Sequence, residues 1–148
     1  MSKERIFKKV FVGGDKNIGR VPDKVAQWLD DCMERGESIL ISDENSLHVQ
    51  AYLNNAKKYG NVTVYHSEDE CRCNLGNWET KYVPDVSYSN EKNIALVADC
   101  DCGMFVYDRG DLAMRMAVNH LRAQGKPIFV YRTDIAGFKI TRRKGEVK

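Results

Sequence analysis

Residues 8–14 read KKVFVGG, a short apolar run that ends in two glycines. A run of this length, cut off by residues that favour a turn, is typical of a buried β-strand. After Pro22, apolar side chains recur at the spacing of one helix face. They are Val25, Trp28, Leu29, Cys32 and Met33. Proline is favoured at the first position of a helix, and Gly36 stands where glycine commonly follows the last turn. The opening of the chain therefore predicts a strand followed by an amphipathic helix.

The same alternation continues along the chain. Further strands are expected at Ser38–Ile41, Val62–Tyr65, Cys102–Tyr107 and Ile128–Tyr131, and further helices at about 49–56, at about 91–98 and after Asp111. Short apolar strands between amphipathic helices are typical of parallel strands covered on both faces. With right-handed crossovers, the sequence predicts a three-layer, doubly wound, Rossmann-like α/β sandwich whose five-stranded, mainly parallel sheet has the order 3-2-1-4-5.

The length and composition fit one domain. The chain has 148 residues, of which 43% are hydrophobic and 30% are charged, enough for one core of ordinary size. We expect a single Rossmann-like domain over residues 1–148, with its core at about 8–132 and a basic tail at 133–148 that has room for a short edge strand at Phe138–Ile140.

Charge and hydropathy disfavour two classes of partner. The net charge of +2 is uneven, because residues 1–9 and 133–148 each carry +3 and the rest carries −4. Basic ends of this kind are typical of solvated termini, and aromatic residues do not alternate with basic ones in the body, so a nucleic-acid partner is not expected. The apolar stretches are too short to span a bilayer, and no apolar segment follows the first five residues as in a secretory signal. We expect a cytoplasmic protein without a membrane partner.

The predicted sheet brings distant turns together. Ligands of such sheets bind beyond the carboxyl ends of the strands, beside the switch in strand order. The turns at 13–15 and 108–111 follow neighbouring strands and should meet there. The pair Gly13-Gly14 allows close approach of a phosphate to the backbone, or it simply turns the chain off a strand. The spacing GGDKNIG is not the dinucleotide-binding fingerprint.

Polar residues that follow the predicted strands are the candidates for ligand binding. The binding candidates are Gly13, Gly14, Asp15, Asp43, Asn45, Ser46, Ser67 and Gly110, and the candidate catalytic carboxylates are Asp108, Asp111 and Asp15. Carboxylates at this edge can bind ribose hydroxyls, stabilise an oxocarbenium-like transition state or hold Mg²⁺. In the alternative interpretation, Asp43 and Asp111 cap helices. The neighbouring acids Asp43 and Glu44 would repel a dianionic ligand.

Cysteine and histidine give weaker signals. The pairs Cys71/Cys73 and Cys100/Cys102 would supply four thiolates for Zn²⁺ if the intervening chain folded back, but structural zinc sites have longer spacings within each pair. We therefore predict no metal site and no cofactor, and all five cysteines as thiols. His48 is expected on the surface or half-buried, and His66, at a strand end, is better placed for function. In the polar stretch 66–89, Trp78 is expected to belong to the core beneath a packed flap; the alternative is a lid on which Trp78 and Tyr82 stack a ligand.

Several stretches carry a family resemblance. They are the Gly-Gly-Asp turn at 13–15, VQAYL at 49–53 with NVTVY at 61–65, CRCNLGNW at 71–78, ADCDCGMFVYD at 98–108 and GKPIFVY at 125–131. They resemble their counterparts in small bacterial and phage Rossmann-like proteins related to the SLOG superfamily. That superfamily includes the "lonely guy" nucleotide phosphoribohydrolases, the DNA-processing proteins and the nucleoside 2-deoxyribosyltransferases. The likeness covers about residues 8–132.

The resemblance implies a nucleotide-like ligand at the carboxyl edge of the sheet, in a homodimer. It places Gly13, Gly14 and Asp15 at a Gly-Ser-Arg-type turn of the relatives and Asp43 in a Gly-Asp-Ala-type loop. Asp15 replaces the phosphate-binding arginine, and the Gly-Thr turn before the fourth helix has no counterpart. The nucleophilic glutamate of the deoxyribosyltransferases is also missing, since residues 114–116 read MRM.

These departures leave three functions open. The first is binding of a nucleotide or nucleotide-derived ligand without strong turnover. The second is an N-glycosidic hydrolase or transferase acting on nucleoside monophosphates, in which Asp108 with Asp15 or Asp111 supplies the catalytic carboxylates. The third is a non-catalytic scaffold. Whether the chain is an enzyme stays open at this stage.

Overall fold

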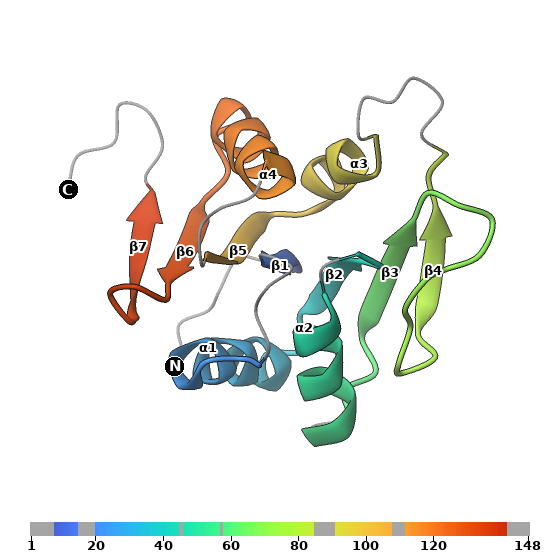
Figure 1. Cartoon of the computed structure of the whole chain (residues 1–148), viewed down its shortest axis with the longest axis horizontal. Helices are drawn as coiled ribbons and strands as arrows, with labels where there is room; N and C mark the ends of the chain where they lie inside the picture. Colours follow the sequence, from blue (N-terminus) through green and yellow to red (C-terminus); the bar gives the residue numbers. More distant parts are fainter. Residues whose placement is uncertain are drawn as a thin grey trace.

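A seven-stranded sheet with helices on both faces forms the molecule (Figure 1). This computed structural model describes residues 8–14, 20–44, 46–56, 58–84, 91–107 and 112–141, and the structural statements below concern these residues. The strands are β1 (Lys9–Gly14), β2 (Ser38–Ser42), β3 (Val62–His66), β4 (Glu79–Tyr82), β5 (Cys102–Tyr107), β6 (Ile128–Arg132) and β7 (Gly137–Thr141). The helices are α1 (Asp23–Glu34), α2 (Leu47–Ala51), the π-helix η1 (Tyr52–Ala56) that continues α2, α3 (Glu91–Asp99) and α4 (Leu112–Ala123).

The order of the strands is β4-β3-β2-β1-β5-β6-β7, with β7 antiparallel to β6 and every other pair parallel. The predicted α/β class with a mainly parallel sheet is confirmed. The prediction of five strands in the order 3-2-1-4-5 is wrong for the complete sheet, because β4 and β7 extend it at the two edges. All four residues of β4 are exposed, so this strand lacks the apolar run by which the others were recognised.

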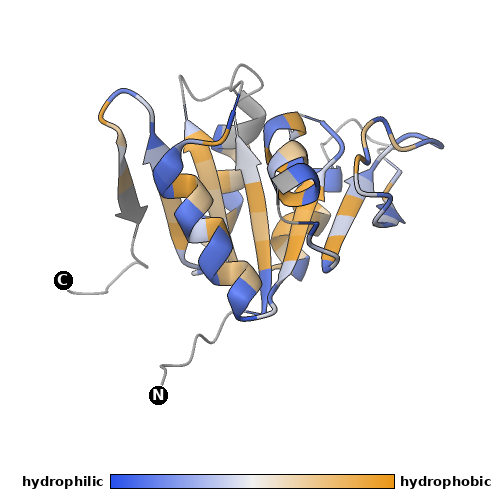
Figure 2. Cartoon of the chain, turned by 90° about the horizontal axis from the view of Figure 1, so that it is seen from below, coloured by the Kyte–Doolittle hydropathy of each residue, from blue (hydrophilic) through white to orange (hydrophobic). Residues whose placement is uncertain are grey.

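Two hydrophobic clusters hold the layers together. Helices α1 and α2 lie on one face of the sheet, and α3 and α4 lie on the other (Figure 1). Alternate residues of β1 serve the two faces, since Val10 and Val12 pack with α1 whereas Phe11 packs with α3 and α4. Figure 2 shows the hydrophobic colouring concentrated in the central strands. Burial on both faces explains why these strands are almost continuously apolar.

Helix α1 ends where the sequence predicted. It begins directly after Pro22, and Gly36 follows its last turn with a φ of +74°. The amide of Gly36 donates to the carbonyl of Met33 at 3.0 Å. Because a side chain disfavours this left-handed conformation, glycine suits the position.

The segment after β3 folds onto the body as a packed flap, with Trp78 in the core, as predicted. Trp78 is 8% exposed and belongs to the cluster on the α1 and α2 face. Its Nε1 donates to the carbonyl of Tyr59 at 2.7 Å. Tyr82, the other aromatic residue considered for a lid, is 51% exposed and lies at the end of β4.

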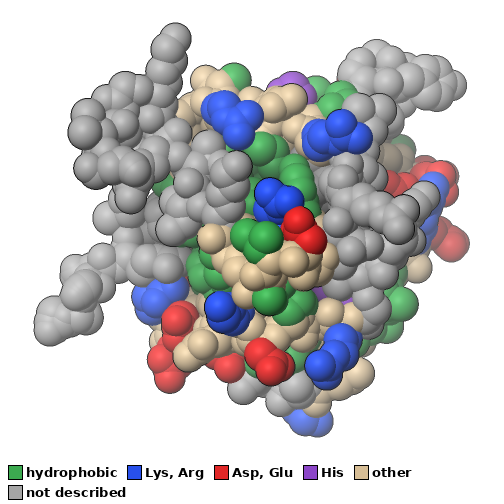
Figure 3. Space-filling view, turned by 60° about the vertical axis from the view of Figure 1, so that its left-hand side comes forward, with side chains coloured by type: hydrophobic (Ala, Val, Ile, Leu, Met, Phe, Trp, Pro, Cys, Tyr) green, Lys and Arg blue, Asp and Glu red, His purple; other side chains and the backbone are tan. Residues whose placement is uncertain are grey.

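The surface carries both signs of charge. On the face in Figure 3, basic and acidic side chains of the described residues are interspersed. Among the helices of the described ranges, none has the length and apolar character needed to cross a membrane.

Candidate functional site at the carboxyl edge of the sheet

The carboxyl ends of β1 and β5 lie side by side. Gly13 pairs with Phe105 and Gly14 pairs with Val106, while β2 pairs with β1 on its other side. The strands that precede the turns at 13–15 and 108–111 therefore end next to each other. The predicted site residues Asp15, Asn45, Asp108, Gly110 and Asp111 lie outside the described residues.

His48 of α2 packs against Gly14 at this edge. A Cβ atom added to Gly14 would lie 3.1 Å from both Cε1 and Nε2 of His48. His48 is only 5% exposed, and its Nε2 atom has no hydrogen-bond partner among the described residues. Burial lowers the pKa of His48 to about 4, so the imidazole is neutral at pH 7. Gly14 thus makes room for a buried, neutral ring whose Nε2 atom has no partner among the described residues.

The prediction of an exposed or half-buried His48 is wrong because its ring packs against Gly14 at the end of β1. A distant segment also contacts α2. The side chain of Gln50 donates to the carbonyl of Cys73 at 2.9 Å and accepts from the amide of Leu75 at 2.8 Å. These bonds hold residues 73–75 against α2. Polar residues around His48 in the sequence suggested solvent, but Ser46 and Gln50 are themselves buried.

Asp43 and Lys92 form a buried ion pair at the end of β2. Lys92 Nζ lies 2.9 Å from Asp43 Oδ1, and the two side chains are almost fully buried. The other carboxylate oxygen of Asp43 accepts from the amide of Arg72 at 2.8 Å. Asp43 therefore does not cap α2; it joins the end of β2 to α3 and to the segment that follows β3. The residue before α2 is Ser46, whose side chain makes no cap hydrogen bond.

Two described cations of this region, Lys92 and Arg72, have carboxylate partners. Lys92 also lies 3.2 Å from Glu44, and Arg72 contacts Glu44 at 2.6 Å and Glu68 at 2.7 Å. With Asp43, this cluster holds three carboxylates and two cations, a net charge of −1. A phosphate is disfavoured beside it, in line with the expectation from the neighbouring acids Asp43 and Glu44.

The remaining described candidates have different roles. Ser46 is buried, donates to the carbonyl of Ser42 at 2.5 Å and accepts from Gln50 at 3.0 Å, so it holds the loop. Ser67 follows β3, two strand positions from β1, which corresponds to about 10 Å. Beside it, His66 Nδ1 lies 2.6 Å from the carbonyl oxygen of Glu68, and its ring packs 5.5 Å from the ring of Tyr82. Neither Ser67 nor His66 adjoins the end of β1.

The cysteines are placed as thiols. Cys100 packs with the cluster on the α3 and α4 face, and Cys102 packs with the opposite one. Burial raises the pKa of Cys100 to about 11 and also raises the pKa values of Cys71 and Cys73. In the part of the chain that the structure describes, no group of three or more potential metal-ligating side chains occurs.

The strand order and the helices on both faces define a three-layer α/β protein with a mostly parallel sheet, whose strand order switches between β1 and β5. Comparisons of the chain with models of protein families, with curated proteins and with solved structures found no match. The resemblance to Rossmann-like proteins related to the SLOG superfamily therefore stays a prediction.

Sequence reasoning missed two buried polar residues, His48 and Lys92. Both stand in the first turn of a helix, and the helix that carries His48 follows β2 after residues 43–46. Helices of a doubly wound sheet begin at its carboxyl edge, where ligands bind, so a polar residue in a first turn is the signal that points to them.

Proposed function

We propose that this protein binds a nucleotide or a nucleotide-derived small molecule at the carboxyl edge of the sheet, beside the adjoining ends of β1 and β5. One observation carries the proposal: the buried Nε2 atom of His48, packed on Gly14, lacks a hydrogen-bond partner among the described residues. Buried polar atoms without a partner are rare and costly. A ligand group that reaches Nε2 supplies the missing hydrogen bond.

The electrostatics of the edge favour the nucleoside part of such a ligand near His48. A neutral imidazole offers one donor and one acceptor, which suits a ribose hydroxyl or the polar edge of a base. The neighbouring cluster around Asp43 carries a net charge of −1, which repels phosphate. We therefore propose that the sugar or base faces α2 and that any phosphate lies away from the end of β2.

A binding assay with matched variants tests this function. Nucleosides, nucleoside monophosphates and dinucleotides are compared by thermal shift and then by calorimetry on the intact chain. His48→Leu removes both ring nitrogens, and a lost hydrogen bond predicts an affinity about three- to tenfold lower. His120→Gln on α4 is the control and leaves binding unchanged. The proposal fails if no compound of the panel binds, or if His48→Leu binds as tightly as the unaltered chain.

Turnover and assembly belong to the same proposal. We propose binding without strong turnover, because Asp15 and the stretch MRM at 114–116 depart from the pattern of the relatives. We further propose a cytoplasmic protein that forms the homodimer implied by the resemblance. Release of free base from nucleoside monophosphates would instead support the N-glycosidic hydrolase, and its loss in Asp108→Asn would support Asp108, with Asp15 or Asp111, as the catalytic carboxylates. A monomer in sedimentation equilibrium would contradict the dimer.

A further inference from the structure

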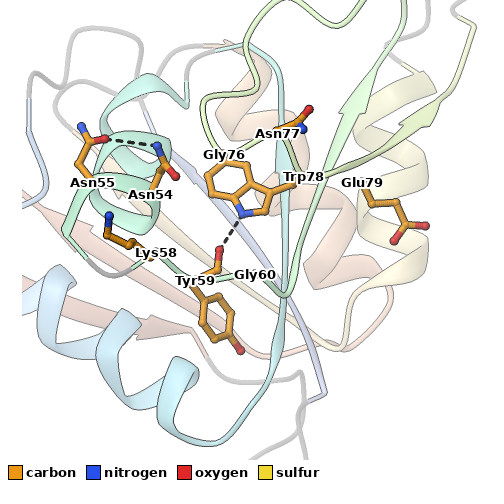
Figure 4. Close-up of a pocket in the computed structure, with 9 residues that line it drawn as sticks. All are labelled: Asn54, Asn55, Lys58, Tyr59, Gly60, Gly76, Asn77, Trp78 and Glu79. Atoms are coloured by element: carbon orange, nitrogen blue, oxygen red, sulfur yellow. Dashed lines mark hydrogen bonds between the residues drawn. The ribbon is translucent and has the colours of Figure 1, made fainter.

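A polar groove lies at the opposite edge of the sheet from the proposed nucleotide site. It has a volume of about 600 Å³ and lies where η1 ends and β3 and β4 begin (Figure 4). This volume falls in the range of small-molecule sites. We call it the amide groove; its principal lining side chains are Asn54, Asn55, Lys58, Asn77, Trp78 and Glu79.

Three departures from regular backbone geometry converge on the amide groove. The π-helix η1, a form that is uncommon and frequent at functional sites, carries Asn54 and Asn55. Lys58 and Asn77 have φ angles of +52° and +53°, in the left-handed region that favours glycine. Two residues that line the groove therefore adopt a backbone conformation in which glycine would have a lower steric energy.

The floor of the groove is rigidly held. Besides the bond from its indole to Tyr59, Trp78 is bracketed by Asn74, which accepts from the backbone amide of Trp78 and donates to its carbonyl, each at 2.9 Å. A Cβ atom on Gly76 would lie 2.2 Å from Cε2 of the indole, so the backbone of Gly76 packs directly on the ring. Because Trp78 is already held in place, this floor of the groove lowers the entropic cost of binding.

The chemistry of the lining selects a neutral ligand rich in hydroxyl groups. Carboxamides both donate and accept hydrogen bonds, as hydroxyls do, and the lining includes Asn54 and Asn55 of η1 and Asn77 of the segment before β4. Lys58 and Glu79 contribute opposite charges, so the described lining residues carry no net charge to attract a phosphate or a polyamine. We propose that the amide groove is a binding site for a neutral sugar ring, separate from the nucleotide site.

Fluorescence of Trp78 tests the proposal. The chain has two tryptophans, so Trp28→Phe leaves Trp78 as the single reporter. In that background, titration with a panel of neutral mono- and disaccharides is expected to give a saturable change in emission. Asn54→Ala and Asn77→Gly each remove one carboxamide and should weaken binding about three- to tenfold. Asn119→Ala on α4 is the matched control and should bind normally.

The design separates loss of binding from loss of folding. Asn77→Gly relieves the left-handed strain, so its melting temperature should rise while its affinity falls. His48→Leu should bind the sugar normally, because the two sites lie at opposite edges, so the result does not depend on the nucleotide proposal. The proposal is overturned if no neutral sugar gives a saturable change, if both asparagine variants bind as tightly as the Trp28→Phe chain, or if inorganic phosphate is the only ligand that responds.

Discussion

Lys92 Nζ lies 2.9 Å from Asp43 Oδ1, and the two side chains are 6% and 2% exposed. The pair joins two elements that are far apart in the sequence, the end of β2 and the first turn of α3. A buried ion pair adds little to stability compared with apolar residues, but removing one partner strands a buried charge. This contact therefore makes the carboxyl edge of the sheet sensitive to single substitutions.

Lys92→Met should lower the free energy of unfolding by about 3 kcal/mol, because it leaves the Asp43 carboxylate buried without its cation. The double variant Lys92→Met/Asp43→Asn should recover a large part of that loss. Urea denaturation of the two variants and of Asp43→Asn alone gives the coupling energy. A Lys92→Met chain as stable as the unaltered one would show that the pair is not formed in solution.

Stability should fall in acid through His48. Burial lowers its pKa in the folded chain from 6.5 to about 4. Between these values the unfolded chain binds a proton that the folded chain does not, so the stabilising contribution is complete above pH 6.5 and is lost as the pH falls towards 4. The loss amounts to about 3 kcal/mol.

The measurement compares the unaltered chain with His48→Gln at several pH values between neutrality and pH 4. As the pH falls, the unaltered chain should lose more unfolding free energy than His48→Gln. In NMR spectra, the ring protons of His48 should not titrate near pH 6.5. His120→Gln is the control and should leave the His48 signals unchanged. A normal titration of His48 would refute its burial.

Gly14→Ala should destabilise the fold by about 1–2 kcal/mol, because the new methyl group would lie 3.1 Å from the ring of His48 and 3.4 Å from Cβ of Val106. The effect should be smaller in a His48→Ala background, where the ring is gone. Thermal unfolding of the four chains tests this coupling. Equal effects of Gly14→Ala in both backgrounds would contradict the contact.

Lys58→Gly should raise the stability by about 1 kcal/mol, since glycine adopts the left-handed conformation of Lys58 without the steric cost of a Cβ. For a chain of this size, that corresponds to a melting temperature about 2–4 °C higher. Lys24→Gly, at the exposed second residue of α1, is the control and should lower stability by a few tenths of a kcal/mol (about half the cost of glycine in a helix interior). If both variants are destabilised alike, Lys58 is not held in this conformation.

The edge strand β4 shows what the sequence pattern could not reveal. The five strands recognised from the sequence are apolar because both of their faces are covered, and they occupy the centre of the sheet. β4 has no such pattern, because all four of its residues are exposed and it is held by main-chain bonds to β3. Because main-chain pairing does not depend on side-chain type, a polar edge strand gives only a weak sequence signal.

The sequence likewise predicted one part of the candidate site and missed another. The sequence predicted that the turns after β1 and β5 follow adjacent strands, and the pairing of Gly14 with Val106 confirms the adjacency of the strand ends. It did not predict the burial of His48 or the pairing of Lys92 with Asp43. Both depend on segments far apart along the chain, because His48 of α2 packs against Gly14 of β1 and Lys92 of α3 pairs with Asp43 after β2.

Local periodicity, together with the turn residues at Gly13-Gly14 and Gly36, was enough to determine the α/β class, the central strands and the edge at which a ligand is expected. Those features are governed by interactions between residues near in sequence and by the burial of apolar side chains. The partners of buried polar atoms were decided by the tertiary structure alone. A polar side chain is stable inside the protein only when a hydrogen-bond or ion-pair partner lies next to it. That partner is often distant in sequence, and no local sequence pattern identifies it.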